Sequence, residues 1–265
     1  MTLTAYQIEA ADRLDQARTG IKPTAPVRDV LGSTDVDSAY VVQAELTRRR
    51  VEAGGVVVGR KIGLTSPAVQ KQLGVDQPDF GVLFADMHVA DGGTVPTATL
   101  LQPKVEAEVA FLLGADLDGP LDLASVRAAV THAVPALEIV DSRVDDWDIT
   151  IVDTVADNGS SAAFVLGETA VPIAEVEPRE VQMQLTVDGD VASSGDGAAC
   201  LGDPLEALLW LARAAQDLGD PLREGQIILS GALGPMVPVT PGSTVRAVIT
   251  GLGDVSVAFD QEVRS

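Results

Sequence analysis

The sequence contains a single cysteine, Cys200, in 265 residues. One cysteine excludes an internal disulfide and a metal site built from several thiolates. Aromatic residues make up only 3% of the chain, so aliphatic side chains must fill the core and no aromatic platform is available for stacking nucleic-acid bases. No apolar run approaches the roughly 20 residues of a transmembrane helix, and the N-terminus lacks the apolar segment of a signal peptide. We therefore expect a cytoplasmic protein that does not enter a membrane.

Basic residues are also scarce. The chain has 18 Lys and Arg against 39 Asp and Glu, a formal net charge of −21. This surplus would repel a phosphate backbone rather than release its counterions, so nucleic acid is not an expected partner. The negative charge could serve to keep the surface well solvated, as in halophilic proteins, or to attract divalent cations. Composition alone favours the solvated surface.

Apolar residues, by contrast, are sufficient for a core. Hydrophobic residues make up 46% of the chain, and the mean hydropathy is +0.22, which argues against a disordered or coiled-coil chain. Helical spacing of apolar residues predicts a first helix that stops at Gly20 and a second helix over about 35–53, with Ser33 and Thr34 as the capping residues that mark its start. We expect a helical N-terminal segment over 1–55 and a β-rich catalytic domain over 56–265, which together form one functional unit.

From Val56 onwards, short β-branched runs separated by Gly and Pro predict a mixed, β-rich body. Helices are expected over about 123–132 and from Asp203, where Pro204 takes the first helical position. Asp188-Gly189-Asp190 predicts a tight hairpin. The expected strands are 56–62, 82–84, 105–113, 136–140, 162–166, 181–187, 227–229, 244–250 and 255–259.

Two glutamates stand out in the expected strand 105–113. Glu106 and Glu108 share one face of that strand, roughly 6.5 to 7 Å apart, because successive side chains alternate. The commonest reason for such a pair is a solvated face of an antiparallel strand. Glu138, however, stands alone in the apolar run 134–140, where an unpaired carboxylate would cost several kcal/mol of desolvation.

These three carboxylates favour a particular kind of metal. They have no cysteine partners, and His88 and His132 are the only histidines, so a hard, oxygen-ligated cation such as Mg²⁺ or Mn²⁺ is favoured over zinc. An arginine paired with Glu138 is the structural alternative, and the residues alone leave the two open. Neither histidine lies in a motif, so both are expected in packing or surface roles.

Lys61 is one of only four lysines and ends an apolar run that begins at Gly55. A lysine in this place can lose proton affinity by desolvation, keep its charge and bind an anionic substrate, or extend its ammonium group into solvent. Ser66-Pro67 predicts the start of a short helix, and the segment 76–81, which contains Asp79, predicts a turn or a lid loop. The segment 157–161, which contains Ser160, could bind a carboxylate or a water, and it is equally a generic turn.

Taken together, several segments resemble the 2-keto-4-pentenoate hydratase family, part of the wider fumarylacetoacetate hydrolase superfamily. The resemblance extends from about residue 56 to residue 259. Segments 198–205 and 229–236 look more like these hydratases than like the sister 2-oxo-3-hexenedioate decarboxylases. The segments that carry the resemblance are Gly59-Arg60-Lys61-Ile62-Gly63-Leu64-Thr65-Ser66, Asp76-Gln77-Pro78-Asp79-Phe80-Gly81, Glu106-x-Glu108, Glu138-Ile139-Val140-Asp141-Ser142 and Asn158-Gly159-Ser160.

The resemblance implies an α+β fold, a twisted mixed β-sheet roll with flanking helices, in a homo-oligomer. A complex with a downstream aldolase or a sister decarboxylase is a further expected partnership. The implied reaction is the metal-dependent hydration of 2-hydroxypenta-2,4-dienoate to 4-hydroxy-2-oxopentanoate, a step in meta-cleavage catabolism of aromatic or steroid rings. By the same resemblance, Glu106, Glu108 and Glu138 match ligands of Mg²⁺ or Mn²⁺, Lys61 matches the active-site lysine, and Asp79 and Ser160 match further catalytic-pocket positions.

Three other functions are alternatives to hydration, two of them enzymatic and one non-catalytic. A 2-oxo-3-hexenedioate (4-oxalocrotonate) decarboxylase would use the same enolate stabilisation, but its pocket must accept a second carboxylate, so an extra arginine or lysine there would favour it. Hydrolytic cleavage of a C–C bond would need a base that activates water, and neither histidine lies in a convincing motif for that. A non-catalytic subunit would have no reason to keep Lys61 beside all three glutamates.

Overall fold

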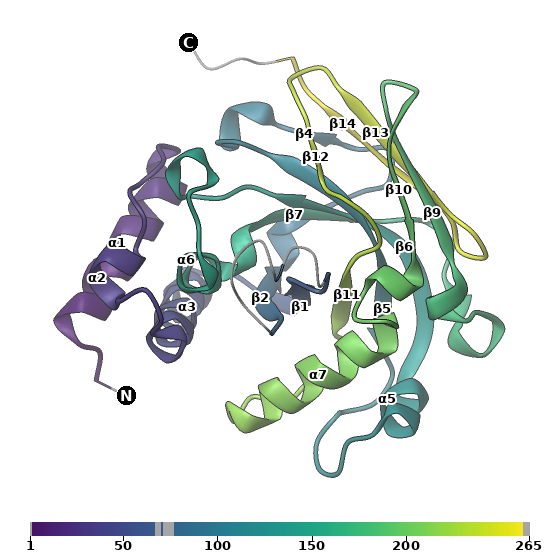
Figure 1. The fold of residues 1–265 in the computed structure, drawn as a ribbon, viewed down its shortest axis with the longest axis horizontal. Coiled ribbons are helices and arrows are strands. Elements are labelled where there is room, and N and C mark those ends of the chain that lie inside the picture. The colour runs from purple at the N-terminus through teal and green to yellow at the C-terminus, as the bar shows by residue number, and fades with distance from the viewer. Residues whose placement is uncertain (1, 67–69, 71–76, 262–265) are drawn as a thin grey trace.

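A computed structural model describes residues 2–66, 70 and 77–261 (Figure 1). Among these residues, no helix has both the length and the apolar character needed to cross a membrane. The α-helices are α1 (Ala5–Gly20), α2 (Arg28–Leu31), α3 (Val36–Glu52), α5 (Leu123–Ala129), α6 (Ile151–Ala156) and α7 (Pro204–Asp217). The strands are β1 (Val57–Gly63), β2 (Asp79–Phe84), β3 (His88–Val89), β4 (Thr94–Val95), β5 (Lys104–Leu113), β6 (Val130–Val140), β7 (Ser161–Leu166), β8 (Val171–Pro172), β9 (Gln182–Val187), β10 (Asp190–Asp196), β11 (Ile227–Ala232), β12 (Val237–Pro238), β13 (Thr244–Ile249) and β14 (Gly253–Phe259).

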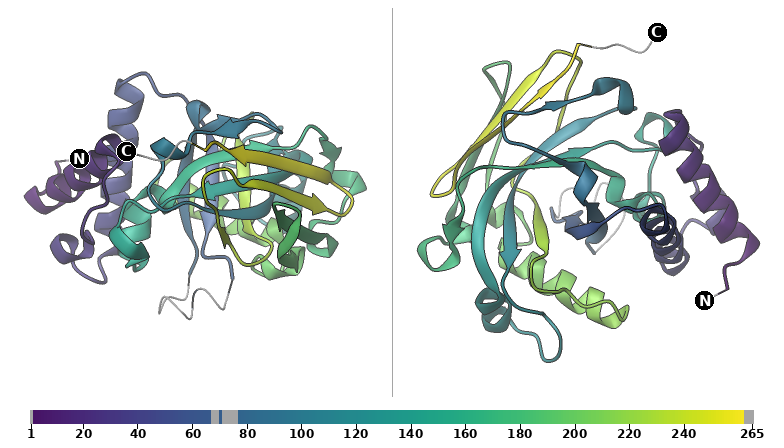
Figure 2. Two further views of the ribbon diagram at one scale, coloured as in Figure 1. Left: turned by 90° about the horizontal axis from the view of Figure 1, so that it is seen from above. Right: turned by 180° about the vertical axis from the view of Figure 1, so that it is seen from behind.

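The strands form two sheets. The larger has the order β2-β1-β11-β5-β6-β7-β3, with β12 beside β5 and β8 beside β6, and the smaller has the order β10-β9-β13-β14-β4. The larger sheet is mixed, because β1 runs parallel to β11 and antiparallel to β2. Aliphatic side chains of both sheets, such as Val109 and Leu137 on one and Val245 and Val257 on the other, lie in one buried cluster. Figures 1 and 2 show that the strands curl around this core, with α7 along one side, so the expected α+β fold with a curled mixed sheet is confirmed.

The N-terminal helices pack together at one side of the sheets, where α1, α2, α3 and α6 lie next to one another (Figure 1). Ala11 and Leu14 of α1 share a buried cluster with Val42 of α3 and Val152 of α6. The first helices and the β-rich part thus have a common core, and the division at residue 55 stays a prediction. Helix α3 lies within the expected range, but its capping residue is Asp35, whose carboxylate accepts a hydrogen bond from the Ser38 amide, and not Ser33 or Thr34.

All the expected strands overlap observed ones, and the Asp188-Gly189 hairpin joins β9 to β10 with both residues at positive φ, as a two-residue turn requires. The expected helix over 123–132 is wrong at its end. Helix α5 stops at Ala129, and β6 begins at Val130, because the following β-branched and apolar residues pair along the whole length of β5.

The expected turn or lid loop over 76–81 is wrong at residues 79–81, whereas Gln77 lies in a bend and Pro78 has no regular structure. Residues 79–81 begin β2, in which every residue is buried and which pairs with β1. The apolar sequence Phe-Gly-Val-Leu-Phe after Asp79 outweighs the turn signals of Pro78 and Gly81, because it covers the edge of β1. The short helix expected at Ser66-Pro67 lies almost entirely outside the described residues.

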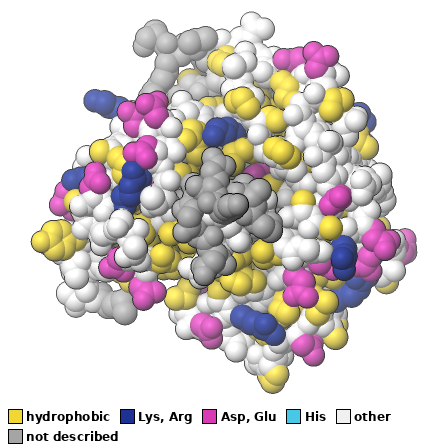
Figure 3. All heavy atoms as spheres, in the orientation of Figure 1, with side chains coloured by type: hydrophobic (Ala, Val, Ile, Leu, Met, Phe, Trp, Pro, Cys, Tyr) yellow, Lys and Arg dark blue, Asp and Glu magenta, His cyan; other side chains and the backbone are white. Residues whose placement is uncertain are grey.

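Acidic side chains are scattered over the face shown in Figure 3, interspersed with Lys and Arg. Several ion pairs are exposed on both sides, such as Arg48 with Glu52 and Arg246 with Asp254, and such pairs contribute little to stability. The arrangement on this face agrees with the interpretation of the negative charge as a solvated surface.

Candidate metal centre and active site

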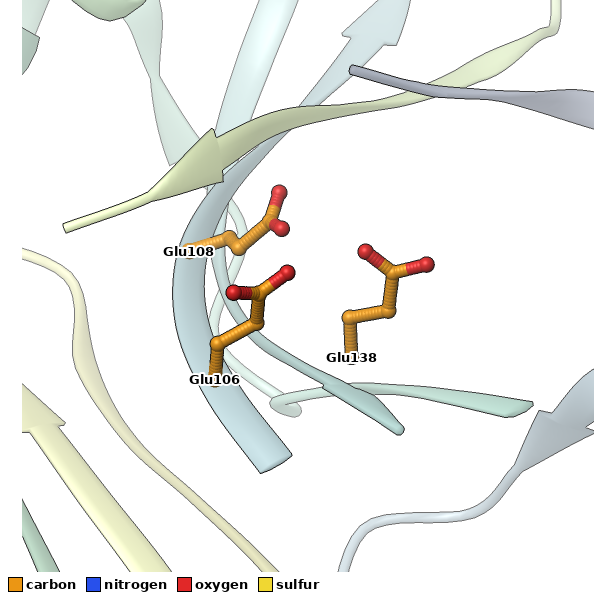
Figure 4. Close-up of side chains that lie close together, drawn as sticks. All are labelled: Glu106, Glu108 and Glu138. Atoms are coloured by element: carbon orange, nitrogen blue, oxygen red, sulfur yellow. The ribbon is translucent and has the colours of Figure 1, made fainter. Parts of the chain in front are cut away.

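Three glutamates meet inside the larger sheet (Figure 4). Glu106 and Glu108 project from the same face of β5, and Glu138 lies directly opposite Glu106 on the antiparallel strand β6. Glu106 is 8% exposed, and the other two are fully buried. One carboxylate oxygen from each residue lies within 4.8 Å of the other two. The solvated-face explanation of Glu106 and Glu108 is therefore wrong.

Protein groups only partly satisfy these carboxylates. Glu108 Oε2 accepts a 2.6 Å hydrogen bond from the Gly231 amide, whereas Glu108 Oε1 and both Glu138 oxygens accept none of good geometry. Within the described part of the chain, no arginine pairs with Glu138, and its ionic partner is Lys61, with Nζ 3.3 Å from Oε2. The arginine alternative is thus ruled out there, and acceptor oxygens remain free.

Burial and mutual repulsion make the charged state of this cluster costly. Burial first, and the neighbouring Glu138 second, raise the pKa of Glu106 to about 7. The pKa of Glu108 is raised for the same two reasons, and burial raises that of Glu138 against the opposing effect of Lys61. Close, buried carboxylate oxygens without donors are the ligands that a hard divalent cation prefers. The three glutamates therefore fit such a cation and could hold it.

Lys61 lies near the end of β1 with a side chain only 3% exposed, so its ammonium group does not reach solvent. Burial lowers the pKa of Lys61, but the carboxylates of Glu138, Asp79, Glu106 and Glu108 outweigh this effect, and the net shift is upward. Of the alternatives open from the sequence, a retained positive charge is the one that this environment favours.

Asp79, the first residue of β2, stands beside Lys61. Its Oδ2 accepts a hydrogen bond from Thr154 Oγ1 at 3.2 Å, its Oδ1 has no hydrogen-bond partner, and burial raises its pKa. A Cβ atom at Gly63 would stand 2.1 Å from Asp79 Oδ1 and 3.3 Å from Lys61 Nζ. The missing side chain at Gly63 thus leaves room for the Asp79 carboxylate and the Lys61 ammonium group on the same side of the backbone.

The turn that carries Ser160 is strained and clamped. Asn158, Gly159 and Ser160 have φ values of 57°, 61° and 53°, a left-handed conformation that costs non-glycine residues about 1 to 2 kcal/mol each. The Asn158 side chain holds the turn to β2, because it accepts a hydrogen bond from the Val82 amide at 2.7 Å and donates one to the Val82 carbonyl at 2.9 Å. Ser160 Oγ donates to the buried Asp157 at 3.2 Å. A segment that the sequence left as a possible generic turn is therefore held rigidly beside Lys61.

Gly81 on β2 tests this clamp, because its missing side chain makes room for the turn. A Cβ atom there would stand 2.3 Å from the Asn158 carbonyl oxygen, closer than packing permits. We expect Gly81→Ala to lower the free energy of unfolding by about 1 to 3 kcal/mol and to lower kcat, since the turn must shift. Urea unfolding and steady-state kinetics would measure both. Gly20→Ala is the matched control, because nothing lies within 4 Å of its Cβ position, and equal behaviour of the two variants would contradict the clamp.

A cavity of about 250 Å³ joins these elements. Lys61, Asp79, Ser160 and Glu106 all line it, so the structure brings these predicted residues together, while Glu108 and Glu138 are buried next to Glu106. Sequence reasoning missed several lining residues, although Lys104 could have been found, since it precedes Glu106 by two residues on the same strand face. The missed residues are Lys104, Trp147, Ile149, Thr154 and Met236.

Comparisons with known proteins show the family to which the chain belongs. The profile of the family described as fumarylacetoacetate (FAA) hydrolase C-terminal matches residues 55–259. The chain is 53% identical to a TodF product hydratase of Pseudomonas putida, over 95% of this chain and 94% of that protein. It is also 53% identical to a 2-keto-4-pentenoate hydratase of Paraburkholderia xenovorans, with the same coverage. Among solved structures, 4-oxalocrotonate decarboxylase from Pseudomonas putida G7, complexed with magnesium and adipate, superposes with a TM-score of 0.93 at 35% identity, over 97% of this chain and 99% of that one.

Proposed function

The chain belongs to the fumarylacetoacetate hydrolase family and is about half identical to its 2-keto-4-pentenoate hydratases. We propose that the hydration of 2-keto-4-pentenoate takes place in the cavity beside Lys61. The reaction makes the protein a hydro-lyase of meta-cleavage catabolism. Water is added to 2-hydroxypenta-2,4-dienoate, the enol form of 2-keto-4-pentenoate, and the product is 4-hydroxy-2-oxopentanoate. The observation that carries the assignment of the site is the meeting of Lys61, Asp79 and Glu106 at one cavity, with Glu108 and Glu138 buried next to Glu106.

In this proposal, Glu106, Glu108 and Glu138 hold a divalent cation, with Mg²⁺ or Mn²⁺ as the preferred ions. The support is the set of buried oxygens without hydrogen-bond donors and the magnesium named with the related decarboxylase structure. When bound, such a cation would polarise the 2-oxo group of the substrate and stabilise the negative charge that builds on its oxygen.

The side chains of the protein then have separable tasks. The substrate must gain a proton at C5, water must add at C4, and a proton must reach C3. Lys61 Nζ is a charged donor at the cavity wall and can supply a proton or orient the substrate anion. Asp79, with its raised pKa and its unpaired Oδ1, is suited to exchange a proton with Lys61 or with the attacking water. Ser160, held by Asp157, offers its hydroxyl oxygen as an acceptor for that water.

The decarboxylase reaction is the second candidate, and one observation favours it. Lys104 also lines the cavity, and it is an extra cation of the kind that a second substrate carboxylate would need. Against this, the chain is 53% identical to hydratases and 35% identical to the decarboxylase. The hydratase activity therefore stands ahead, and the diacid is the substrate to test beside it.

The reaction can be tested directly. Supplied with enzymatically generated 2-hydroxypenta-2,4-dienoate and Mg²⁺ or Mn²⁺, the protein is expected to bleach the dienol absorbance and form 4-hydroxy-2-oxopentanoate without releasing CO₂. In heavy water, deuterium should appear at C3 and C5, because both carbons take a proton from solvent. Faster release of CO₂ from 2-oxo-3-hexenedioate than hydration of the dienoate would replace the hydratase assignment by the decarboxylase.

We further propose that the protein works in the cytoplasm as a homo-oligomer, and that it associates with a downstream aldolase or a sister decarboxylase. The family resemblance supports these statements. Light scattering of the purified chain would measure the oligomer, and co-purification with either enzyme would test the complex.

A further inference from the structure

A second cavity adjoins the substrate cavity and has no part in the chemistry described above. It measures about 470 Å³, compared with about 250 Å³ for the cavity beside Lys61. Lys104 and Trp147 line both cavities, so the two meet at this pair of residues. A substrate bound in the first cavity therefore has a neighbouring space larger than its own.

The boundary between the two cavities is made of side chains rather than of a strand. The Lys104 ammonium group lies 4.0 Å from the centre of the Trp147 indole ring, and no carboxylate lies within ion-pair distance of it among the described residues. The indole Nε1 donates a 3.0 Å hydrogen bond to the Gln102 carbonyl. Asp146 and Trp147 both have positive φ, at 54° and 55°, so a strained backbone places the indole there. The Lys104 side chain is flexible and the Trp147 ring is fixed, so a ligand can pass from one cavity to the other if the Lys104 side chain alone moves.

The position of the boundary matches the length of the substrate. Lys104 shares the face of β5 with Glu106, roughly 7 Å along the strand, a distance comparable to an extended five-carbon chain. If the 2-oxo acid end lies at the glutamates, the far end of a five-carbon substrate reaches the Lys104 and Trp147 pair. Carbon atoms beyond C5 would then enter the second cavity.

The wall of the second cavity is suited to an apolar chain. Beyond Lys104, its lining contains no charged side chain and is built mainly from Leu100, Leu101, Pro103, Pro238, Val239 and Pro241. We propose that this cavity is a tail subsite that accepts 2-hydroxy-2,4-dienoates with an alkyl extension beyond C5. The proposal rests on the hydratase function and adds the substrate class to it.

A homologous series tests this subsite. The 2-hydroxy-2,4-dienoates of five, six, seven and eight carbons would be assayed with Mg²⁺. We expect kcat/KM to rise about threefold to fourfold for each added methylene, the gain from burying one such group. A kcat/KM that falls from the five-carbon to the eight-carbon substrate would overturn the proposal, and so would a preference for a chain of equal length that ends in a carboxylate.

A filling variant localises the effect. Pro238 lies in the two-residue strand β12 and lines the second cavity. Pro238→Trp is expected to lower the ratio of kcat/KM for the eight-carbon over the five-carbon substrate at least tenfold. Pro172→Trp is the matched control, because Pro172 is also exposed, also follows a valine in a two-residue strand, and lines neither cavity. Leu100→Trp is the second filling variant, and the proposal fails if both filling variants leave the ratio at the control value.

A binding measurement separates this proposal from the hydratase assignment. Saturated 2-oxo acids of five and eight carbons would be titrated calorimetrically into the Mg²⁺-loaded protein. Tighter binding of the longer acid, lost in Pro238→Trp, would support the tail subsite even if no dienoate were hydrated. Hydration of the five-carbon dienoate together with equal binding of both acids would leave the function intact and overturn the subsite.

Discussion

Glu108→Gln is expected to abolish most turnover and, at the same time, to stabilise the protein when no divalent cation is present. Glu106→Gln is expected to behave in the same way. Glu138→Gln should also abolish most turnover but should not stabilise the protein, because Glu138 is the ion-pair partner of the buried Lys61. At Glu106 and Glu108 the change removes a negative charge where burial and the neighbouring Glu138 raise the pKa of the carboxyl group, and relieving an uncompensated buried charge stabilises the fold. Each change also removes a ligand oxygen, so the substrate loses the charge stabilisation that the cation supplies.

The measurement combines activity with thermal unfolding. In excess chelator, the wild-type protein should be inactive, and adding Mg²⁺ or Mn²⁺ should restore kcat and raise the Tm, because a ligand that binds only the native state stabilises it. The Glu106→Gln and Glu108→Gln variants should begin from a higher Tm in chelator, and all three glutamine variants should gain less from the cation. Glu168→Gln, at an exposed position outside the cluster, is the control and should behave like the wild type. Full activity of rigorously demetallated protein would falsify the proposed metal dependence.

For Glu106→Gln and Glu108→Gln, the opposite responses of Tm and kcat exclude misfolding as the cause of lost activity. A variant that merely disturbs β5 or β6 would lower both. Glutamine keeps the shape of glutamate and can still accept the hydrogen bond from the Gly231 amide at position 108, so packing is preserved. The pair of measurements therefore reports on charge and ligation.

Some features of the site could be predicted from the sequence, and others could not. Alternation along β5 was enough to place Glu106 and Glu108 on one face, and an isolated acid in an apolar run was enough to mark Glu138. Their meeting depends on the register of β5 with β6, in which Glu106 faces Glu138. Register depends on pairing between strands about 30 residues apart, and local patterns do not contain it.

Asp79 shows the opposite case, in which local signals misled. Pro78 and Gly81 are turn residues, and they predict a loop. The structure instead uses Gly81 for the close approach of Asn158, with no room for a Cβ atom, and β2 continues through it. A glycine that permits tight packing and a glycine that permits a turn look the same in a single sequence.

The boundary at Trp147 lay beyond prediction for a similar reason. Nothing in the segment around residue 147 indicates two successive residues at positive φ, since neither Asp146 nor Trp147 is a glycine. Such strain persists only where the surrounding structure holds it, here through the indole hydrogen bond to Gln102. Two-residue strands such as β12 carry too few residues to show any period.

Lys61→Ala is expected to lower kcat by at least about a hundredfold, because the reaction loses a proton donor or an orienting charge at the substrate. Binding of the divalent cation should survive and become tighter. Lys61 Nζ lies 3.3 Å from Glu138 Oε2, so the ammonium group competes with a cation for the same carboxylate. Removing that competitor leaves Glu138 without an ion-pair partner among the described residues, so a bound cation gains more from its charge.

On one preparation, kcat would be measured in saturating Mg²⁺ so that the variant is folded, and metal affinity would be measured by titrating Mg²⁺ into a demetallated portion. Lys61→Met is the second variant, since it keeps most of the stem that packs beside Gly159, whose Cβ position lies 3.0 Å from Lys61 Cδ. Lys22→Ala, which removes an exposed ammonium group, is the control for net charge and should leave both quantities unchanged. Loss of cation binding in both Lys61 variants would mean that the lysine organises the glutamates instead of acting on the substrate, and a wild-type kcat in either would remove it from the reaction.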